Sequence, residues 1–328
     1  MSEATASARS FITAHLAQAR ALGERLADLI DEPDAYLAAL GEGLTALADE
    51  DYLAMVTRAC PETPARYMVR GPLSDALSAP VKQALKEGSS MSALQLAHRL
   101  AAAEHRDLRL YAHEPLRRAL PQDPEMSWQI MRRLGRAAGD WIATDSLADL
   151  WARGILAEAF RWAEPEQLLY SQQIYERRLI PATLATLPHR VPKAEREQLR
   201  PEAVERALEL VRQLMGDGEA MVQKALSWAL REWTPVDRDA IATFLRAETA
   251  IAAEGRDGAR AWVIRDTLAK QPPELQAELR GRLEGIRRDA KAPSTSIASR
   301  QAAAFAAALT TSTEAVAAQG DRYTRSRP

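Results

Sequence analysis

Trp228 lies in a helical segment at a position that points away from the segment's apolar face. The stretch MVQKALSWALREW, residues 221–233, has no Gly or Pro and repeats apolar residues at helical spacing. Trp228 projects from the side opposite that face, between Lys224 and Arg231. A cationic stripe of this kind could bind a polyanion. The expected core residues are Val222, Leu226, Ala229, Leu230 and Trp233.

A second tryptophan is paired with a carboxylate. In GDWIATDSLADLWARGIL, Trp141 and Asp145 are four residues apart and share one helix face with Ala148 and Ala152. Small residues beside an aromatic ring and a carboxylate predict a shallow hollow. In the alternative interpretation, Trp141 covers the core at the start of the helix and Asp145 is solvated near its positive end. The expected core side carries Ala143, Leu147, Leu150 and Trp151.

Two adjacent arginines, Arg177 and Arg178 in QQIYERRLIPATLATL, could bind a phosphate, because guanidinium matches that anion in shape and charge. The alternative is a solvated helix surface.

The five histidines have no ligand-like spacing, and no glycine-rich phosphate loop or nucleophile elbow occurs. We therefore expect neither a metal nor a cofactor. The lone Cys60 excludes an intramolecular disulfide and fits a reducing compartment.

The elements that must position these residues are helices. Ala, Leu, Arg and Glu dominate the 328 residues, and apolar periodic segments follow one another between Pro and Gly breaks. Pairing of such helices predicts an all-α, HEAT-like α-solenoid of antiparallel helix pairs. We expect an acidic helical extension at residues 1–41, the HEAT-like domain at 42–290, and an Ala/Ser/Thr-rich, partly disordered tail at 291–328.

The charge is distributed unevenly along the chain. The formal net charge is -2, with -6 in residues 1–60 and +4 in residues 251–328. Any nucleic-acid surface must therefore be local.

No apolar run approaches the roughly 18 residues of a membrane helix, and no signal-peptide core occurs at the N-terminus. We expect a cytoplasmic, nucleoid-associated bacterial protein that is a monomer.

Several motifs, in order, resemble the AlkD family of DNA alkylation repair glycosylases, which are built from HEAT-like repeats. The stretch MVQKALSWALREW is similar to that family's Q-K-A-x-x-W-x-L-R-E helix, and DWIATDS fits its W-x-x-x-D-S element. ARYM, at Ala65 to Met68, followed by LSAPVKQAL, is similar to the family's N-terminal helix pair. YERRLI fits the arginine-bearing element through Arg178. The resemblance covers about residues 45–270.

The resemblance implies a DNA glycosylase that excises 3-methyladenine and 7-methylguanine from duplex DNA without needing to flip the base. A cationic purine is already an activated leaving group, so the remaining difficulty is the oxocarbenium character of the sugar. Asp145 would stabilise that sugar and hold the attacking water, and Trp141 and Trp228 would contact the sugar and backbone. The residues implied in DNA binding are Arg178, Lys224, Arg231, Arg177 and Tyr67.

Two rival hypotheses remain beside the enzyme. One is a non-catalytic HEAT-like scaffold that binds DNA or protein, and the other is a purely structural helical protein. A carboxylate between outward-facing tryptophans favours the enzyme, whereas the low overall basicity favours the rivals.

Overall fold

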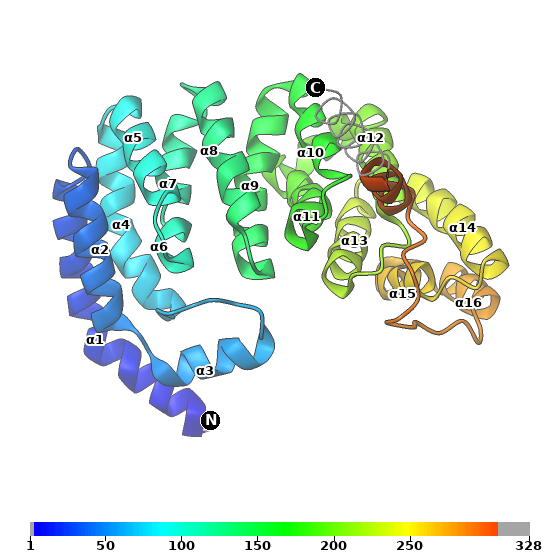
Figure 1. Cartoon of the computed structure of the whole chain (residues 1–328), viewed down its shortest axis with the longest axis horizontal. Helices are drawn as coiled ribbons and strands as arrows, with labels where there is room; N and C mark the ends of the chain where they lie inside the picture. The colour runs from blue at the N-terminus through cyan, green and yellow to red at the C-terminus, as the bar shows by residue number, and fades with distance from the viewer. Residues whose placement is uncertain (1–2, 308–328) are drawn as a thin grey trace, which may run out of the picture. The chain divides into compact units, whose positions relative to one another are not determined.

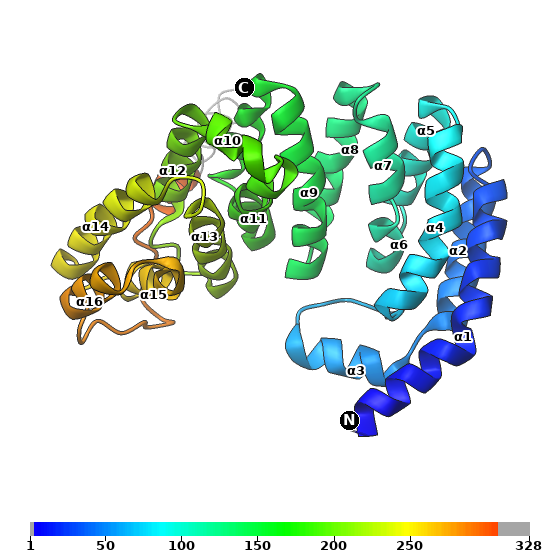
Figure 2. The same ribbon diagram turned by 180° about the vertical axis from the view of Figure 1, so that it is seen from behind.

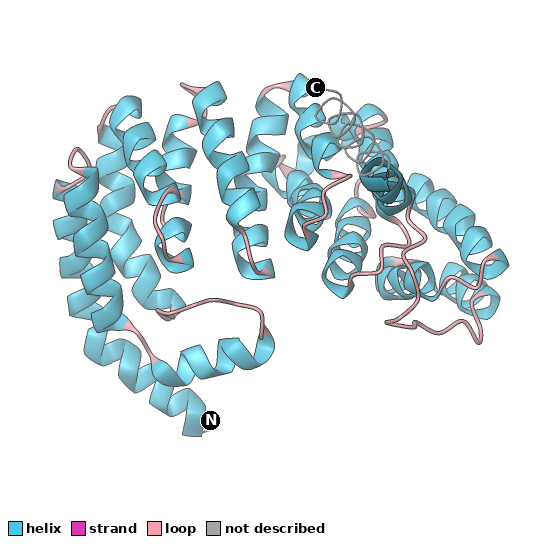
Figure 3. Cartoon of the chain, viewed as in Figure 1, coloured by secondary structure: helices cyan, strands magenta, loops and turns pink. Residues whose placement is uncertain are grey.

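The computed structural model describes residues 3–307, and every regular element among them is helical (Figure 3). The prediction of an all-α protein is confirmed. Contacts between residues divide the chain into two units, Met1–Ala159 and Phe160–Pro328, which are described one at a time. No helix in the described range is long and apolar enough to span a bilayer.

The first unit contains nine α-helices among its described residues (Figure 1). Their bounds are α1 (Glu3–Asp28), α2 (Pro33–Leu47), α3 (Glu50–Ala59), α4 (Gly71–Glu87), α5 (Ser90–Ala101), α6 (Arg106–Leu110), α7 (His113–Ala119), α8 (Pro124–Ala137) and α9 (Trp141–Ala157).

These helices pack in two layers. One layer consists of α4, α7 and α9, each in contact with the next, and the long α1 packs along α4 (Figure 2). The other consists of α2, α5 and α8, and α5 and α8 cover α7 and α9. Between α8 and α9 the rings of Trp128 and Trp151 meet edge to face with centroids 4.9 Å apart. Gly154 allows this approach, because a Cβ there would collide with the Trp128 ring.

The second unit repeats the two-layer principle. Here α11, α13 and α15 form one layer, and α12 and α14 pack against it. The bounds are η1 (Ala159–Trp162, which begins at the division), α10 (Ala163–Leu168), α11 (Ile174–Arg190), η2 (Lys193–Leu199), α12 (Glu202–Leu214), α13 (Ala220–Trp233), α14 (Arg238–Glu254), α15 (Gly258–Thr267), η3 (Leu268–Lys270) and α16 (Pro273–Arg282).

Aspartate N-caps and prolines set many of the helix boundaries. The side chains of Asp49, Asp123 and Asp140 accept a hydrogen bond from the backbone N–H three residues ahead, at the starts of α3, α8 and α9. A proline usually marks a break between helices, but the break expected at Pro165 is wrong, because this residue lies inside α10. It occupies the first turn, where backbone N–H groups lack an intrahelical partner anyway.

Three other expectations differ from the structure or extend beyond it. ARYM does not form a helix, because Ala65 to Met68 lie in the connection between α3 and α4. The expected boundary after residue 41 falls within α2. Residues 297–307 of the expected tail are helical, whereas 308–328, including its predicted disorder, lie outside the described residues.

Candidate active site and nucleic-acid interface

Trp141 and Asp145 lie on one partly exposed stripe of α9, as predicted from their spacing. Trp141 is the first residue of the helix, and both side chains are half-buried. The opposite side carries the buried Leu147, Leu150 and Trp151, which confirms the core assignment for these three residues. The indole and the carboxylate are therefore both accessible from the same side of α9.

The alanines expected beside this pair do not line an open hollow. Ala148 and Ala152 have no exposed surface, because both are covered where α9 packs against its neighbours. Helical spacing alone placed them next to Asp145 but could not show that the adjoining helices approach this closely. The prediction that they form an open hollow is wrong.

A buried arginine holds the start of α9. Arg106 Nε donates to Asp140 Oδ2, and Arg106 Nη2 donates to Asp140 Oδ1, each at 2.9 Å. The guanidinium therefore binds both carboxylate oxygens in a bidentate pair. Asp140 Oδ1 also accepts the N–H of Ala143 at 2.9 Å as the N-cap of α9. Burial alone would raise the pKa of Asp140, but the bonds from Arg106 outweigh it and hold this pKa below its usual range. The helix end that carries Trp141 is thus fixed by a charged pair.

The same arginine connects α9 to the loop that contains Tyr67. Arg106 Nη1 donates to Asp107 Oδ1 at 2.8 Å. Asp107 Oδ2 accepts the backbone N–H groups of Arg66 at 2.6 Å and Tyr67 at 2.9 Å. This bonding explains why ARYM is not helical, because a side chain has taken the N–H groups that a helix would use. The half-buried Tyr67 ring meets the His105 ring edge to face at 6.3 Å.

In the second unit, α13 presents the predicted cationic stripe in part. The five residues expected in its core are all buried. Trp228 is half-buried, and Lys224 is exposed with no ion pair among the described residues. Arg231 instead forms an ion pair with Asp266 and donates to its backbone carbonyl at 3.1 Å. Lys224 is therefore the cation of this stripe whose charge is most available to an external anion.

Arg177 and Arg178 are both engaged within the protein. Arg177 Nε donates to Oδ2 of the fully buried Asp217 at 2.8 Å. Arg178 is buried and donates from Nη1 to the carbonyl of Met221 in the first turn of α13 at 2.5 Å. The alternative of a solvated arginine surface is wrong, since α11 uses these residues to hold the beginning of α13.

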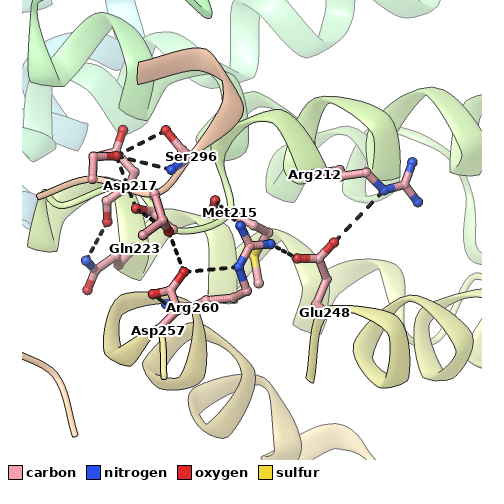
Figure 4. Close-up of polar contacts among 11 residues, drawn as sticks. Arg212, Met215, Asp217, Gln223, Glu248, Asp257, Arg260 and Ser296 are labelled. Atoms are coloured by element: carbon pink, nitrogen blue, oxygen red, sulfur yellow. Dashed lines mark hydrogen bonds and ion pairs between the residues drawn. The ribbon is translucent and has the colours of Figure 1, made fainter. Parts of the chain in front are cut away.

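A buried polar network fixes the loop that leads into α13 (Figure 4). Gln223 Nε2 donates to the carbonyl of Asp217 at 2.6 Å. Arg260 donates to Asp257 Oδ2 at 3.2 Å, to the carbonyl of Met215 at 2.9 Å and to Glu248. Desolvation raises the pKa of Glu248 although the Arg260 cation opposes it. A network of buried ion pairs and hydrogen bonds thus holds the loop that leads into α13.

Residues 294–296, which we call the strap, close this network. The Thr295 N–H donates to the carbonyl of Gly216 at 3.0 Å, and the Thr295 hydroxyl donates to Asp257. The Ser294 hydroxyl also donates to the Gly216 carbonyl, at 3.1 Å. The strap therefore belongs to the second unit, although it lies within the segment expected to be a tail.

Sequence reasoning missed the groups that position the candidate residues. Asp140 could have been found, because an aspartate directly before a periodic apolar segment is an N-cap signal. The partnership of Arg106, Asp107 and Asp140 could not, since the side chains meet only when α6 lies beside α9.

The described residues form an all-helical protein of layered helices that carries an indole and a carboxylate on one accessible stripe. The chain belongs to the family of DNA alkylation repair enzymes, whose model matches residues 40–270. Comparison with curated proteins and with solved structures gave no significant match. The resemblance drawn from the motifs is confirmed, and membership gives the protein a role in the repair of alkylated DNA. Within residues 3–307 no cluster of His, Cys, Asp and Glu is arranged to hold a metal ion.

Proposed function

We propose that the protein is a monofunctional DNA glycosylase that hydrolyses the N-glycosidic bond of cationic alkylpurines, such as 3-methyladenine and 7-methylguanine, in duplex DNA. The observation that carries the proposal is the stripe of α9, where Trp141 and the Asp145 carboxylate lie one helical turn apart and are both accessible. Membership in the alkylation repair family supports the choice of substrate.

The chemistry requires little from the protein at the leaving group. An alkylated purine with a positive charge departs as a neutral base, so no strong general acid is needed. Positive charge then develops on the deoxyribose, and a carboxylate placed beside it lowers the barrier. Asp145 supplies this charge and orients the attacking water, and the Trp141 ring contacts the sugar through its electron-rich face.

The remaining candidates are assigned to the DNA backbone. Lys224 is exposed and pairs with a phosphate, and the half-buried Trp228 contacts sugar and backbone on the same helix. Arg178 acts indirectly, because it holds the first turn of α13 through the Met221 carbonyl. Tyr67 is held at the start of α9 by Asp107 and contributes a contact there.

The test is release of 7-methylguanine and 3-methyladenine from alkylated duplex DNA. Asp145→Asn keeps the size of the side chain but removes its charge, and we expect the rate of release to fall by about 100-fold or more. Asp239→Asn is the matched control, since Asp239 is an exposed carboxylate in the first turn of α14, and it should release bases at the wild-type rate.

The outcomes separate this proposal from its rival. If the wild type binds DNA but releases neither base, the protein is the non-catalytic scaffold, which the low net charge and the internally paired Arg177 and Arg231 favour. If Asp145→Asn releases bases at the wild-type rate, the glycosylase stands and the role of Asp145 is wrong.

A further inference from the structure

A cavity of about 150 Å³ in the first unit opens to solvent between α4 and α7. Two of its cations, Lys82 and Lys86, are one turn apart on α4, and two more come from adjacent positions on α7. The residues that line it are Lys82, Leu85, Lys86, Glu114, Arg117 and Arg118. A convergence of four cations from two helices needs a counter-charge.

The carboxylates nearby are too few to balance these cations. Glu114 Oε1 lies 3.4 Å from Lys82 Nζ and 2.6 Å from Arg117 Nη1, so one carboxylate serves two cations. Asp149 of α9 accepts from Arg117 Nη2 at 2.9 Å. Its pKa is held below the usual range, since the bonds from Arg117 and Arg153 outweigh the effect of burial.

The other two cations have no carboxylate partner among the described residues. Arg118 donates to the backbone carbonyls of Leu85 at 3.0 Å and Gly88 at 3.1 Å, which fixes its guanidinium but leaves its charge uncompensated. Lys86 is exposed and forms no ion pair within residues 3–307. The cavity therefore carries an excess of positive charge on a rigid base.

We propose that this cavity is a subsite for a phosphodiester of the DNA backbone. The proposal rests on the proposed function, from which it takes duplex DNA as the ligand. Phosphate oxygens accept several hydrogen bonds at once, and both lysine and arginine recognise them.

The location of the cavity relates it to the candidate catalytic stripe. Arg117 joins α7 to Asp149, which lies one helical turn beyond Asp145 on α9. The cavity and Asp145 thus belong to the same layer, α4, α7 and α9, in one unit. Neighbouring helices lie about 10 Å apart, roughly three nucleotides at the rise of about 3.4 Å per nucleotide. The subsite is therefore placed to hold a phosphate a few nucleotides from the lesion.

The alternative is a structural role in which the cations cap the C-terminus of α4. Arg118 does so through Leu85 and Gly88. Lys82 is more than a turn before the end of α4, so capping does not account for it. Lys86 lies in the last turn, where its charge is favourable, but among the described residues it makes no hydrogen bond to a carbonyl.

The experiment measures the affinity for an undamaged duplex as a function of salt, for the wild type and for the double variant Lys82→Gln/Lys86→Gln. Loss of one phosphate contact should reduce the slope of log K against log salt by about 0.9. We expect a loss of affinity of about tenfold near 0.1 M salt. Lys193→Gln, an exposed lysine of η2 outside the cavity, is the control and should keep the wild-type slope.

An unchanged slope in the double variant, or no binding of the duplex by the wild type, overturns the proposal. Titration with inorganic phosphate is a separate arm. Binding of phosphate that the double variant loses, with the slope for DNA unchanged, would identify a site for free phosphate instead. Base release is measured on the same samples, so that a wild type with a salt-dependent slope but no release refutes the glycosylase and leaves the subsite standing.

Discussion

Arg178 shows how differently one residue can be interpreted before and after its surroundings are known. In the sequence it is one of two adjacent arginines suited to a phosphate. In the structure its side chain is buried, with its Nη1 bonded to the Met221 carbonyl. Any effect of Arg178 on DNA binding is therefore expected to act through the stability of α13.

Replacing this arginine should weaken the fold. Arg178→Ala removes a charged donor from the part-buried Met221 carbonyl. The loss of a hydrogen bond from a charged group costs about 1–3 kcal/mol of unfolding free energy. Chemical denaturation measures this change. Lys224→Ala, an exposed position on the helix that Arg178 holds, should change stability by less than about 0.5 kcal/mol. Equal stability of the two variants would argue that Arg178 is a surface ligand after all.

At this scale the sequence identified which side chains face outward but not what they touch. Helical periodicity separated Trp141 and Trp228 from the core correctly, because it depends only on the local helix. It failed for Ala148 and Ala152, whose burial depends on neighbouring helices. Residue type alone suggested a phosphate ligand at Arg178 and could not reveal its partner, which lies 43 residues away in the chain.

At the scale of elements, α6, α7 and α9 share their polar groups. Arg106 bonds Asp140 near the start of α9, and Arg117 bonds Asp149 further along it. His113 is the first residue of α7 and lies between Arg106 and Arg117 in the chain. It lines a small pocket with Ala143 and Leu147 of α9. Burial, assisted by the Arg117 cation, lowers the pKa of His113 from 6.5 to about 4.

This shift predicts a pH-dependent stability. The unfolded chain binds a proton at His113 below about pH 6.5, whereas the folded chain resists it until about pH 4, so stability falls as the pH is lowered through this range. We expect a loss of about 1–2 kcal/mol between pH 7 and pH 5. Denaturant midpoints at the two pH values measure it. In His113→Gln that part of the dependence should vanish, and its persistence would place the titration elsewhere.

The element boundaries were largely predictable because Pro and Gly act locally. The breaks at Pro61 to Pro64, Gly88 to Ser90 and Gly216 to Gly218 all separate helices in the structure. Pro181 was a harder case, since it lies within α11 and is buried where this helix packs against its neighbours. Tertiary packing there outweighs the intrinsic cost of proline in a helix.

At the scale of the whole molecule, the folded second unit continues beyond the residues that the family model matches. The match ends at residue 270, and the strap at 294–296 bonds the loop before α13. Gly216 makes this contact possible, because its φ of 87° suits glycine and a Cβ would collide with the Thr295 hydroxyl.

Substitution at this glycine tests the strap. Gly216→Ala should lower the free energy of unfolding by about 1–3 kcal/mol through backbone strain, with the displacement of Thr295 adding to it. Gly281→Ala, where a Cβ meets no atom within 4 Å and the backbone is helical, should instead raise stability by about 0.5–1 kcal/mol. Thermal and chemical denaturation compare the two. Matching effects of both substitutions would mean that the strap does not constrain the loop.

The hydrogen bonds of the strap also affect the choice of the C-terminal boundary for a truncated fragment of this protein. A fragment ending where the family match ends would leave the Gly216 carbonyl and Asp257 without their donors from Thr295. Asp257 also accepts from Arg260, which donates to the Met215 carbonyl in the loop before the helix that carries Trp228 (Figure 4). Recombinant boundaries chosen by homology alone would thus cut away part of the support of α13, and a fragment that keeps residues 271–307 avoids this.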